Sequence, residues 1–173
     1  SLIAVSPGWI RPMDSGFRIS AGAWYYPSGG IHFGVDFAAP VGKQIKAVGN
    51  GYVIYSSNAC PTYGYLGNNC GYPGIGRGGN QVFLITNIAG KTYMVMYLHL
   101  QKDSPIRQGQ IVNQGDVIGL NGSSGSSTGP HFHIEVTYLG TNSVDYYVRN
   151  WNGSLSFGAG FGSSAMNTRC SVT

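Results

Sequence analysis

The amino-acid sequence predicts a mostly β fold, and three observations carry this expectation. Only 9% of the 173 residues are charged, whereas the chain holds 28 glycines and 12 tyrosines. This balance disfavours coiled coils and charged disordered chains and suits a turn-rich β protein. Short β-prone runs also alternate with turn signals, and no segment has the periodicity of an ordinary amphipathic helix. Because apolar residues are spread along the whole chain, we expect residues 1–173 to form one domain around one core.

The first half of the chain predicts an irregular entry segment, a hairpin and a long loop. Residues 1–31 are rich in Gly, Pro and aromatic residues without helical periodicity, so we expect one short strand that leads to a loop over residues 25–30. Residues 43–57 place β-prone runs on either side of Asn50-Gly51, a strong hairpin signal. Residues 58–79 hold seven glycines, three tyrosines and two cysteines, which is typical of a long surface loop.

The second half predicts further strands and one turn of helix. The strands are expected over Gln81–Thr86, Thr92–Leu100, His131–Tyr138 and, as shorter pieces, within Gln110–Leu120. Residues 87–90 should join the first two, and a Ser- and Gly-rich stretch precedes the strand at His131. The tail, residues 140–173, lacks linker composition and is expected to pack on the domain, with a short helical turn around Asp145–Arg149.

The charge pattern argues against nucleic-acid binding. Ten Lys or Arg residues against six Asp or Glu give a formal charge of +4, which favours attraction to an anionic polymer or surface. The basic residues are scattered and no basic helix or aromatic-basic motif accompanies them. No apolar run approaches the length of a membrane span, so membrane insertion is not expected either.

The three cysteines show no CxxC spacing, so a cysteine zinc site or a thioredoxin-type motif is not expected. Cys60 and Cys70 fit a disulfide across a short loop, which would suit an exported protein and leave Cys170 unpaired; three buried or free thiols are the alternative. The sequence starts at Ser1 without a signal peptide, and we therefore expect a processed mature form or an excised domain.

The four histidines fall into three groups: His32 with Asp36, His131 with His133, and His99 alone. His32 and Asp36 are four residues apart, a spacing that brings both side chains to one side of a helical turn or an extended strand. His131 and His133 are two apart on a predicted strand and therefore point to one face. His99 lies in the strand that ends at Leu100. Each residue alone has an ordinary structural explanation, since a lone histidine is usually a hydrogen-bonded residue and Asp favours turns and caps.

Taken together, these residues predict a metal site. Neutral imidazoles and one carboxylate form a common tetrahedral zinc environment, and three protein ligands leave a fourth position for water, as catalytic zinc sites require. A dinucleotide-binding site and the zinc sites of two other enzyme classes are excluded by the residues around their motifs. Gly74 to Gly79 have the letters of a dinucleotide fingerprint but follow a loop and precede a strand. His133-Ile134-Glu135 lacks the Pro-Cys-x-x-Cys partner of a zinc deaminase, and no His-Glu-x-x-His motif occurs.

The motifs His32-Phe33-Gly34-Val35-Asp36, Tyr97-Leu98-His99-Leu100 and Pro130-His131-Phe132-His133 resemble the lysostaphin and LytM type of zinc peptidase. The segments around them, residues 29–37, 78–81 and 122–130, are similar to that family as well, so the resemblance covers about residues 26–136. Residues 58–79 look longer than the matching family segment, and the tail matches poorly. These departures lie in the expected walls of the site.

The resemblance implies a compact antiparallel β domain with one zinc ion at the floor of a loop-walled groove. It places the zinc on His32, Asp36 and His133, with His99 and His131 as catalytic groups beside it. Tyr26 and Asn80 are expected to bind substrate. Which imidazole acts as the general base stays open at this point. Glu135, on the His133 face of its strand, is either an orienting partner of the metal site or a solvated carboxylate.

The activity implied is zinc-dependent hydrolysis of peptide bonds in bacterial peptidoglycan, by a secreted, bacteriolytic, monomeric enzyme acting at the cell wall. A cross-bridge and the junction of stem and bridge are both open as the bond cut. Two other functions fit the same pattern. One is a non-hydrolytic wall-binding or regulatory domain on the same scaffold, and the other is a peptidase of glycine-rich proteins. No appended wall-binding domain is seen, so we expect that any targeting module lies elsewhere in a longer precursor or does not exist.

Overall fold

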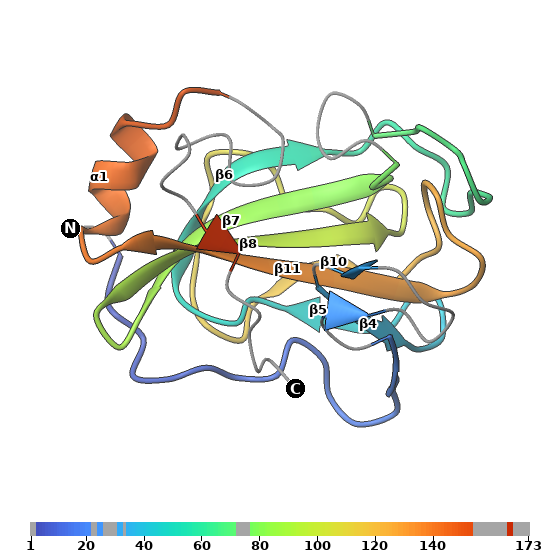
Figure 1. The fold of residues 1–173 in the computed structure, drawn as a ribbon, viewed down its shortest axis with the longest axis horizontal. Helices are drawn as coiled ribbons and strands as arrows, with labels where there is room; N and C mark the ends of the chain where they lie inside the picture. Colours follow the sequence, from blue (N-terminus) through green and yellow to red (C-terminus); the bar gives the residue numbers. More distant parts are fainter. Residues whose placement is uncertain are drawn as a thin grey trace.

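A computed structural model describes residues 3–21, 24–25, 31–32, 34–71, 77–153 and 166–167, with the backbone alone for the short pieces 24–25, 31–32 and 166–167. The predicted mostly β, antiparallel architecture is confirmed (Figure 1). In spatial order the main sheet contains β1 (Arg18–Ala21), β4 (Val35–Ala38), β11 (His131–Gly140), β8 (Lys91–Leu100), β7 (Asn80–Ile88), β6 (Gly51–Ser57) and β9 (Ile111–Val112), while β12 (Met166–Asn167) also pairs with β11.

Two short ribbons and one helix accompany the sheet. The ribbons are β5 (Gln44–Lys46) with β10 (Val117–Leu120), and β2 (Trp24–Tyr25) with β3 (Ile31–His32). The helix α1 (Val144–Arg149) begins after Ser143, whose side chain accepts a hydrogen bond from the backbone N–H of Tyr146. This helix confirms the predicted helical turn. None of the helical residues in the described part of the chain forms an apolar helix long enough to cross a bilayer.

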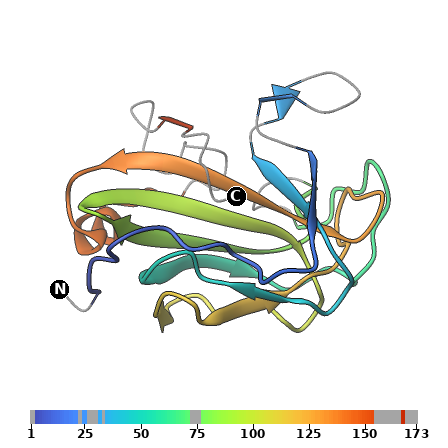
Figure 2. The same ribbon diagram turned by 90° about the horizontal axis from the view of Figure 1, so that it is seen from below.

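The core lies on both faces of the long central strands, which run side by side through the middle of the molecule (Figure 2). Every residue of β7 and all but the first of β8 are buried. One face carries the larger cluster, including Val95, Tyr97 and Phe132, and packs against the β5 and β10 region. The other face carries Met94, Met96 and Leu98 and is covered at one end by α1 through Val144 and Tyr147. At the opposite end of these strands the long loops gather (Figure 1).

The predicted hairpin at Asn50-Gly51 is wrong, although strands occur on both sides of the pair. β5 pairs with β10, whereas β6 pairs with β7 and β9. A two-residue hairpin turn of that type needs positive φ at both residues, and neither Asn50 nor Gly51 has it. Asn50 instead holds distant segments together, because its backbone N–H donates to the Ser6 hydroxyl and its Oδ1 accepts from the Gln114 backbone N–H. Tertiary hydrogen bonds therefore replace the local turn.

The connection between β7 and β8 is shorter than predicted. Only Ala89 and Gly90 lie between the strands, with φ of 54° and 89°, so each strand extends further than its β-prone core. The Asn87 side chain accepts a hydrogen bond from the Gly90 backbone N–H and donates to the Thr92 hydroxyl. Asn87, which reads as a loop residue in the sequence, is thus a strand residue that stabilises the turn.

The long loop before β7 is confirmed over the residues described. It follows β6, which ends at Ser57, and reaches Asn80, where β7 begins. Cys60 and Cys70 form a disulfide within it. Of the two alternatives left by the sequence, the structure therefore has the bridge; Cys170 lies outside the described residues. The bridge therefore constrains the loop that leads from β6 to β7.

Candidate functional site

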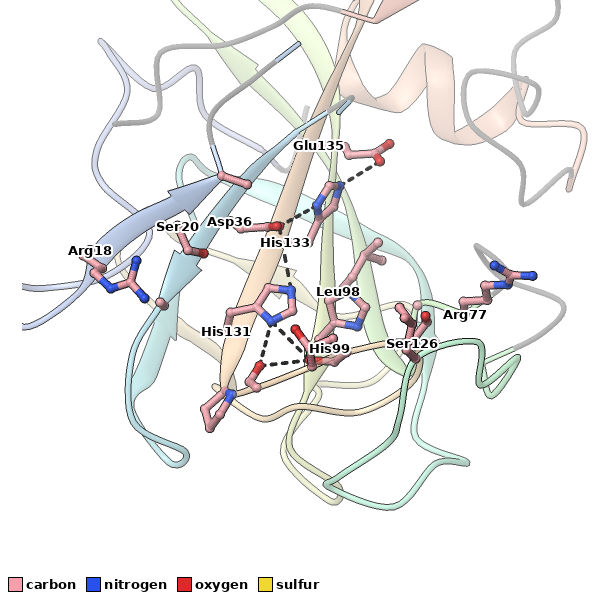
Figure 3. Close-up of a pocket in the computed structure, with 18 residues that line it drawn as sticks. Arg18, Ser20, Asp36, Arg77, Leu98, His99, Ser126, His131, His133 and Glu135 are labelled. Carbon is pink, nitrogen blue, oxygen red and sulfur yellow. Dashed lines mark hydrogen bonds and ion pairs between the residues drawn. The ribbon is translucent and has the colours of Figure 1, made fainter. Parts of the chain in front are cut away.

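A groove of about 940 Å³ opens at the loop end of the main sheet, on the face that α1 covers at the other end. Its floor contains the side chains of Asp36, His99, His131, His133 and Glu135 (Figure 3). Three strands supply them. β4 carries Asp36, β8 carries His99, and β11 carries the other three residues. The walls are formed by β1, by the disulfide loop and by the residues just before β11.

Strand register brings the sequence motifs together. In the antiparallel pairing of β4 with β11, His133 lies directly opposite Asp36, so both side chains stand on one face. Gly34 permits this approach, because a Cβ there would clash with the Ile134 carbonyl and lie 2.7 Å from His133 Nε2. A glycine between His32 and Asp36 is therefore required for their segment to cross β11 so closely.

His133 is held between two carboxylates. Its Nδ1 lies 2.8 Å from Asp36 Oδ1, and its Nε2 lies 2.8 Å from Glu135 Oε1. Burial by itself disfavours the imidazolium, but the hydrogen bonds to Asp36 and Glu135 outweigh it and raise the pKa of His133 to about 9. Both carboxylates are themselves nearly buried. This position consequently favours a positive charge.

The donor set fits a zinc ion. His133 Nδ1 and Asp36 Oδ1 lie side by side, 2.8 Å apart, and the other ring nitrogen is engaged by the Glu135 carboxylate, so a metal ion would take the place of the proton between Nδ1 and Asp36. His32, the third predicted ligand, belongs to β3, which pairs with β2 in the register Trp24 to His32. Its side chain is outside the described residues, and within the described part no three potential ligands form a complete metal site.

His99 reaches the groove through an irregularity of β8. Pairing with β7 shifts between Asn80 and Val82, which face Leu100 and Tyr97, so β8 contains one extra residue there. His99 has a φ of 66°, a left-handed conformation that is uncommon for a non-glycine residue. Strict alternation would turn His99 to the face of Tyr97, into the larger core cluster. The bulge instead directs its ring to the groove, beside Leu98 and His133.

Hydrogen bonds to carbonyls determine which ring nitrogens of His99 and His131 face the groove. His99 Nδ1 lies 2.6 Å from the Ser124 carbonyl oxygen, and His131 Nδ1 lies 2.8 Å from that of Gly129. A carbonyl can only accept, so Nδ1 carries the hydrogen and Nε2 carries the lone pair in each neutral ring. Burial and the nearby His131 and His133 rings lower the pKa of His99 to about 3, so His99 is neutral.

The two rings form one unit beside the Asp36 and His133 pair. The ring centroids of His99 and His131 are 4.8 Å apart, and those of His99 and His133 are 6.4 Å apart. His131 Nε2 lies 3.8 Å from Asp36 Oδ1. The groove therefore combines a place for a cation with two imidazole Nε2 atoms next to it, which can accept hydrogen bonds.

The other predicted site residues have different positions. Tyr26 lies outside the described residues. Asn80 is fully buried, and its side chain accepts from the Cys60 N–H and donates to the carbonyls of Cys60 and Leu100. This geometry gives Asn80 a structural role under the disulfide loop, and substrate contact by it stays a prediction. Sequence reasoning left the role of Glu135 open; its position two residues after His133 was the available signal.

The sequence and the fold are similar to those of known proteins. The model of Peptidase family M23 matches residues 30–146. The chain is 33% identical over 133 residues to lysostaphin of Staphylococcus staphylolyticus, covering 75% of this chain and 23% of that protein. It is 36% identical over 109 residues to the peptidoglycan DD-endopeptidase ShyA of Vibrio cholerae, covering 63% of this chain and 21% of that protein.

A solved structure, that of a zinc-containing peptidase from Vibrio cholerae, matches with a TM-score of 0.55 and 30% sequence identity. The match covers 76% of this chain and 37% of that chain. The chain thus spans about a fifth of the length of the two curated relatives. The similarity extends through the strands that carry Asp36, His99, His131 and His133.

Proposed function

The chain belongs to peptidase family M23, and from this premise we propose that it is a zinc-dependent endopeptidase that hydrolyses peptide bonds in bacterial peptidoglycan. The observation that carries the proposal is the Asp36 and His133 pair with the imidazoles of His99 and His131 beside it in the same groove. The relatives support the substrate class, since lysostaphin and a peptidoglycan DD-endopeptidase are among them. The disulfide supports an exported location, at or outside the cell surface.

In this proposal His32, Asp36 and His133 hold one zinc ion. When bound, the ion supplies Lewis-acid polarisation of the scissile carbonyl and acidifies the attacking water. The protein's own task is then proton transfer. His99 and His131 each offer an Nε2 lone pair, one to accept the proton of the water and the other to hydrogen-bond the reacting groups. The protonated ring then returns a proton to the leaving amine, and Tyr26 is a further proposed donor to the substrate.

Glu135 acts in this scheme as a positioning residue for His133. Its Oε1 accepts the Nε2 hydrogen, so Nδ1, beside Asp36, is the nitrogen that would give up its proton and bind the metal. Glu135 lies opposite Met96 in the pairing of β11 with β8, at the border between the apolar cluster and the groove. This burial excludes competing water and strengthens the hydrogen bond.

Replacing Glu135 by alanine should weaken zinc binding by about 10- to 100-fold, the usual cost of losing such a partner. Glu135→Gln keeps an oxygen that accepts the hydrogen bond and should bind zinc more tightly than the alanine variant. Zinc affinity measured by competition with a chromogenic chelator reads this directly. Asp145→Asn, in α1 away from the groove, is the matched control. Wild-type affinity in Glu135→Ala would contradict the positioning role.

The proposed function is tested by peptide release from purified peptidoglycan. We expect the protein to release peptides with new amino termini, a chelator to stop the release, and added zinc to restore it. Binding to the wall without cleavage would instead support a non-hydrolytic wall-binding domain. Cleavage of glycine-rich proteins but not of peptidoglycan would support the other alternative. Mass spectrometry of the fragments identifies the bond that is cut.

A further inference from the structure

The disulfide loop exposes apolar side chains next to the groove. Among the described residues, the three most exposed large hydrophobic side chains are Leu66 (74%), Tyr65 (68%) and Tyr63 (60%). All three lie between Cys60 and Cys70. We call these three residues the aromatic rim. Of the three, Leu66 lines the groove, together with Ser126 from the facing loop, and Tyr63 and Tyr65 precede it in the same disulfide loop.

This loop is held in place on two sides. Besides the disulfide, the Gly64 N–H donates to the Ser123 carbonyl at 2.7 Å, and the Gly67 N–H donates to the Ser126 hydroxyl at 2.9 Å. Gly64 packs so closely that a Cβ would clash with the Gly125 carbonyl. Backbone contacts thus hold the rim against the loop that leads to His131. The backbone of the rim is fixed in place while its apolar side chains remain exposed to water.

Exposing three large apolar side chains to water costs free energy that a binding partner would recover by covering them. Such a patch therefore indicates an interaction surface. The residues of the loop limit the chemical class of partner that it can bind. Residues 60–70 themselves include no charged side chain, and Arg77, which lines the groove nearby, donates to Asn69 Oδ1 at the edge of the loop. Tyrosine combines a flat apolar ring with a hydroxyl group, which suits a partner that is itself apolar on its faces and polar at its edges. Sugar rings have this property.

We propose that the aromatic rim binds the glycan strand of peptidoglycan while the attached peptide lies in the groove. This proposal rests on the proposed function, because it assumes that the polymer substrate is the bacterial wall. The groove floor, with its carboxylates and imidazoles, is the place for the peptide. The neutral rim directly beyond it meets whatever carries that peptide, and in the wall this is a chain of sugar rings. The rim would therefore favour polymer over free peptide.

The test compares two substrates that differ only in the glycan. Intact peptidoglycan is one, and the same cross-linked peptides freed of glycan by an amidase are the other. For Tyr63→Ala/Tyr65→Ala we expect kcat/KM on intact peptidoglycan to fall about tenfold, the scale of losing interface anchor residues. On the free peptides it should stay within about twofold. Tyr146→Ala, at an exposed tyrosine of α1 at the far end of the sheet, should change neither.

A conservative variant separates contact from folding. Tyr63→Phe/Tyr65→Phe keeps both ring faces and should retain most of the activity on intact peptidoglycan, whereas a loop that merely misfolds would fail on both substrates. Equal losses on the two substrates, or no loss on intact peptidoglycan, would overturn the proposal. Co-sedimentation with purified peptidoglycan gives an independent readout. If wild-type protein cleaves neither substrate, the proposed function fails, while weaker sedimentation of the alanine variant alone would still support the glycan contact.

Discussion

Replacing His133 by alanine is expected to abolish zinc binding and peptidase activity together. The side chain lies opposite Asp36 on paired strands, with Nδ1 2.8 Å from the Asp36 carboxylate, so its removal deletes one donor of the proposed metal site. Metal-ion catalysis is worth several kcal/mol, and each 1.36 kcal/mol is a factor of ten in rate. We therefore expect activity to fall by about a thousandfold or more, measured as peptide release beside zinc content by atomic emission.

A second variant separates the loss of a metal ligand from the loss of folding. Deleting the imidazole leaves Asp36 and Glu135 nearly buried without their shared partner, which is itself destabilising. His133→Asn retains a polar amide between the carboxylates and should fold better, yet it lacks a ring nitrogen for the metal. Thermal unfolding of both variants accompanies the zinc measurement. Full zinc content in a folded His133 variant would contradict its role as a ligand.

Replacing His99 should have a different outcome, with zinc retained and activity lost. The His99 ring is neutral and presents Nε2 to the groove, while its Nδ1 is tied to the Ser124 carbonyl. Loss of a general acid–base group costs typically about 10²- to 10⁴-fold in rate. We expect a loss in this range in kcat, with a zinc content of one ion per chain. Single-turnover hydrolysis of a peptide substrate by the zinc-loaded protein gives the rate of the chemical step.

The choice of substitution matters because of the backbone at this position. His99 has a φ of 66°, and asparagine tolerates the left-handed conformation better than alanine does. His99→Asn is therefore the variant that best preserves the bulge between β7 and β8. If it loses zinc as well as activity, His99 supports the metal site, and if it keeps full activity, His131 alone handles the proton.

Much of the fold follows from local sequence. The low charge, the glycines and the short β-prone runs are properties of neighbouring residues, and they correctly predict a mostly β chain, the long loop before β7 and the helical turn at α1. The hairpin at Asn50-Gly51 was predicted wrongly for a physical reason. Asn50 hydrogen-bonds Ser6 and Gln114, which are distant in sequence, and these tertiary bonds outweigh a turn preference of the Asn-Gly pair.

Some features of the candidate site also follow from the local sequence, and others depend on the tertiary structure. The sequence by itself determined that His131 and His133 share a face, because strand geometry fixes this relation locally, and it predicts that His32 and Asp36 lie on one side of their segment. Only the tertiary structure decided that Asp36 lies opposite His133, that a bulge turns His99 into the groove, and that Glu135 holds the second nitrogen of His133. Strand register, bulges and burial depend on residues far apart in the chain, so no local pattern contains them.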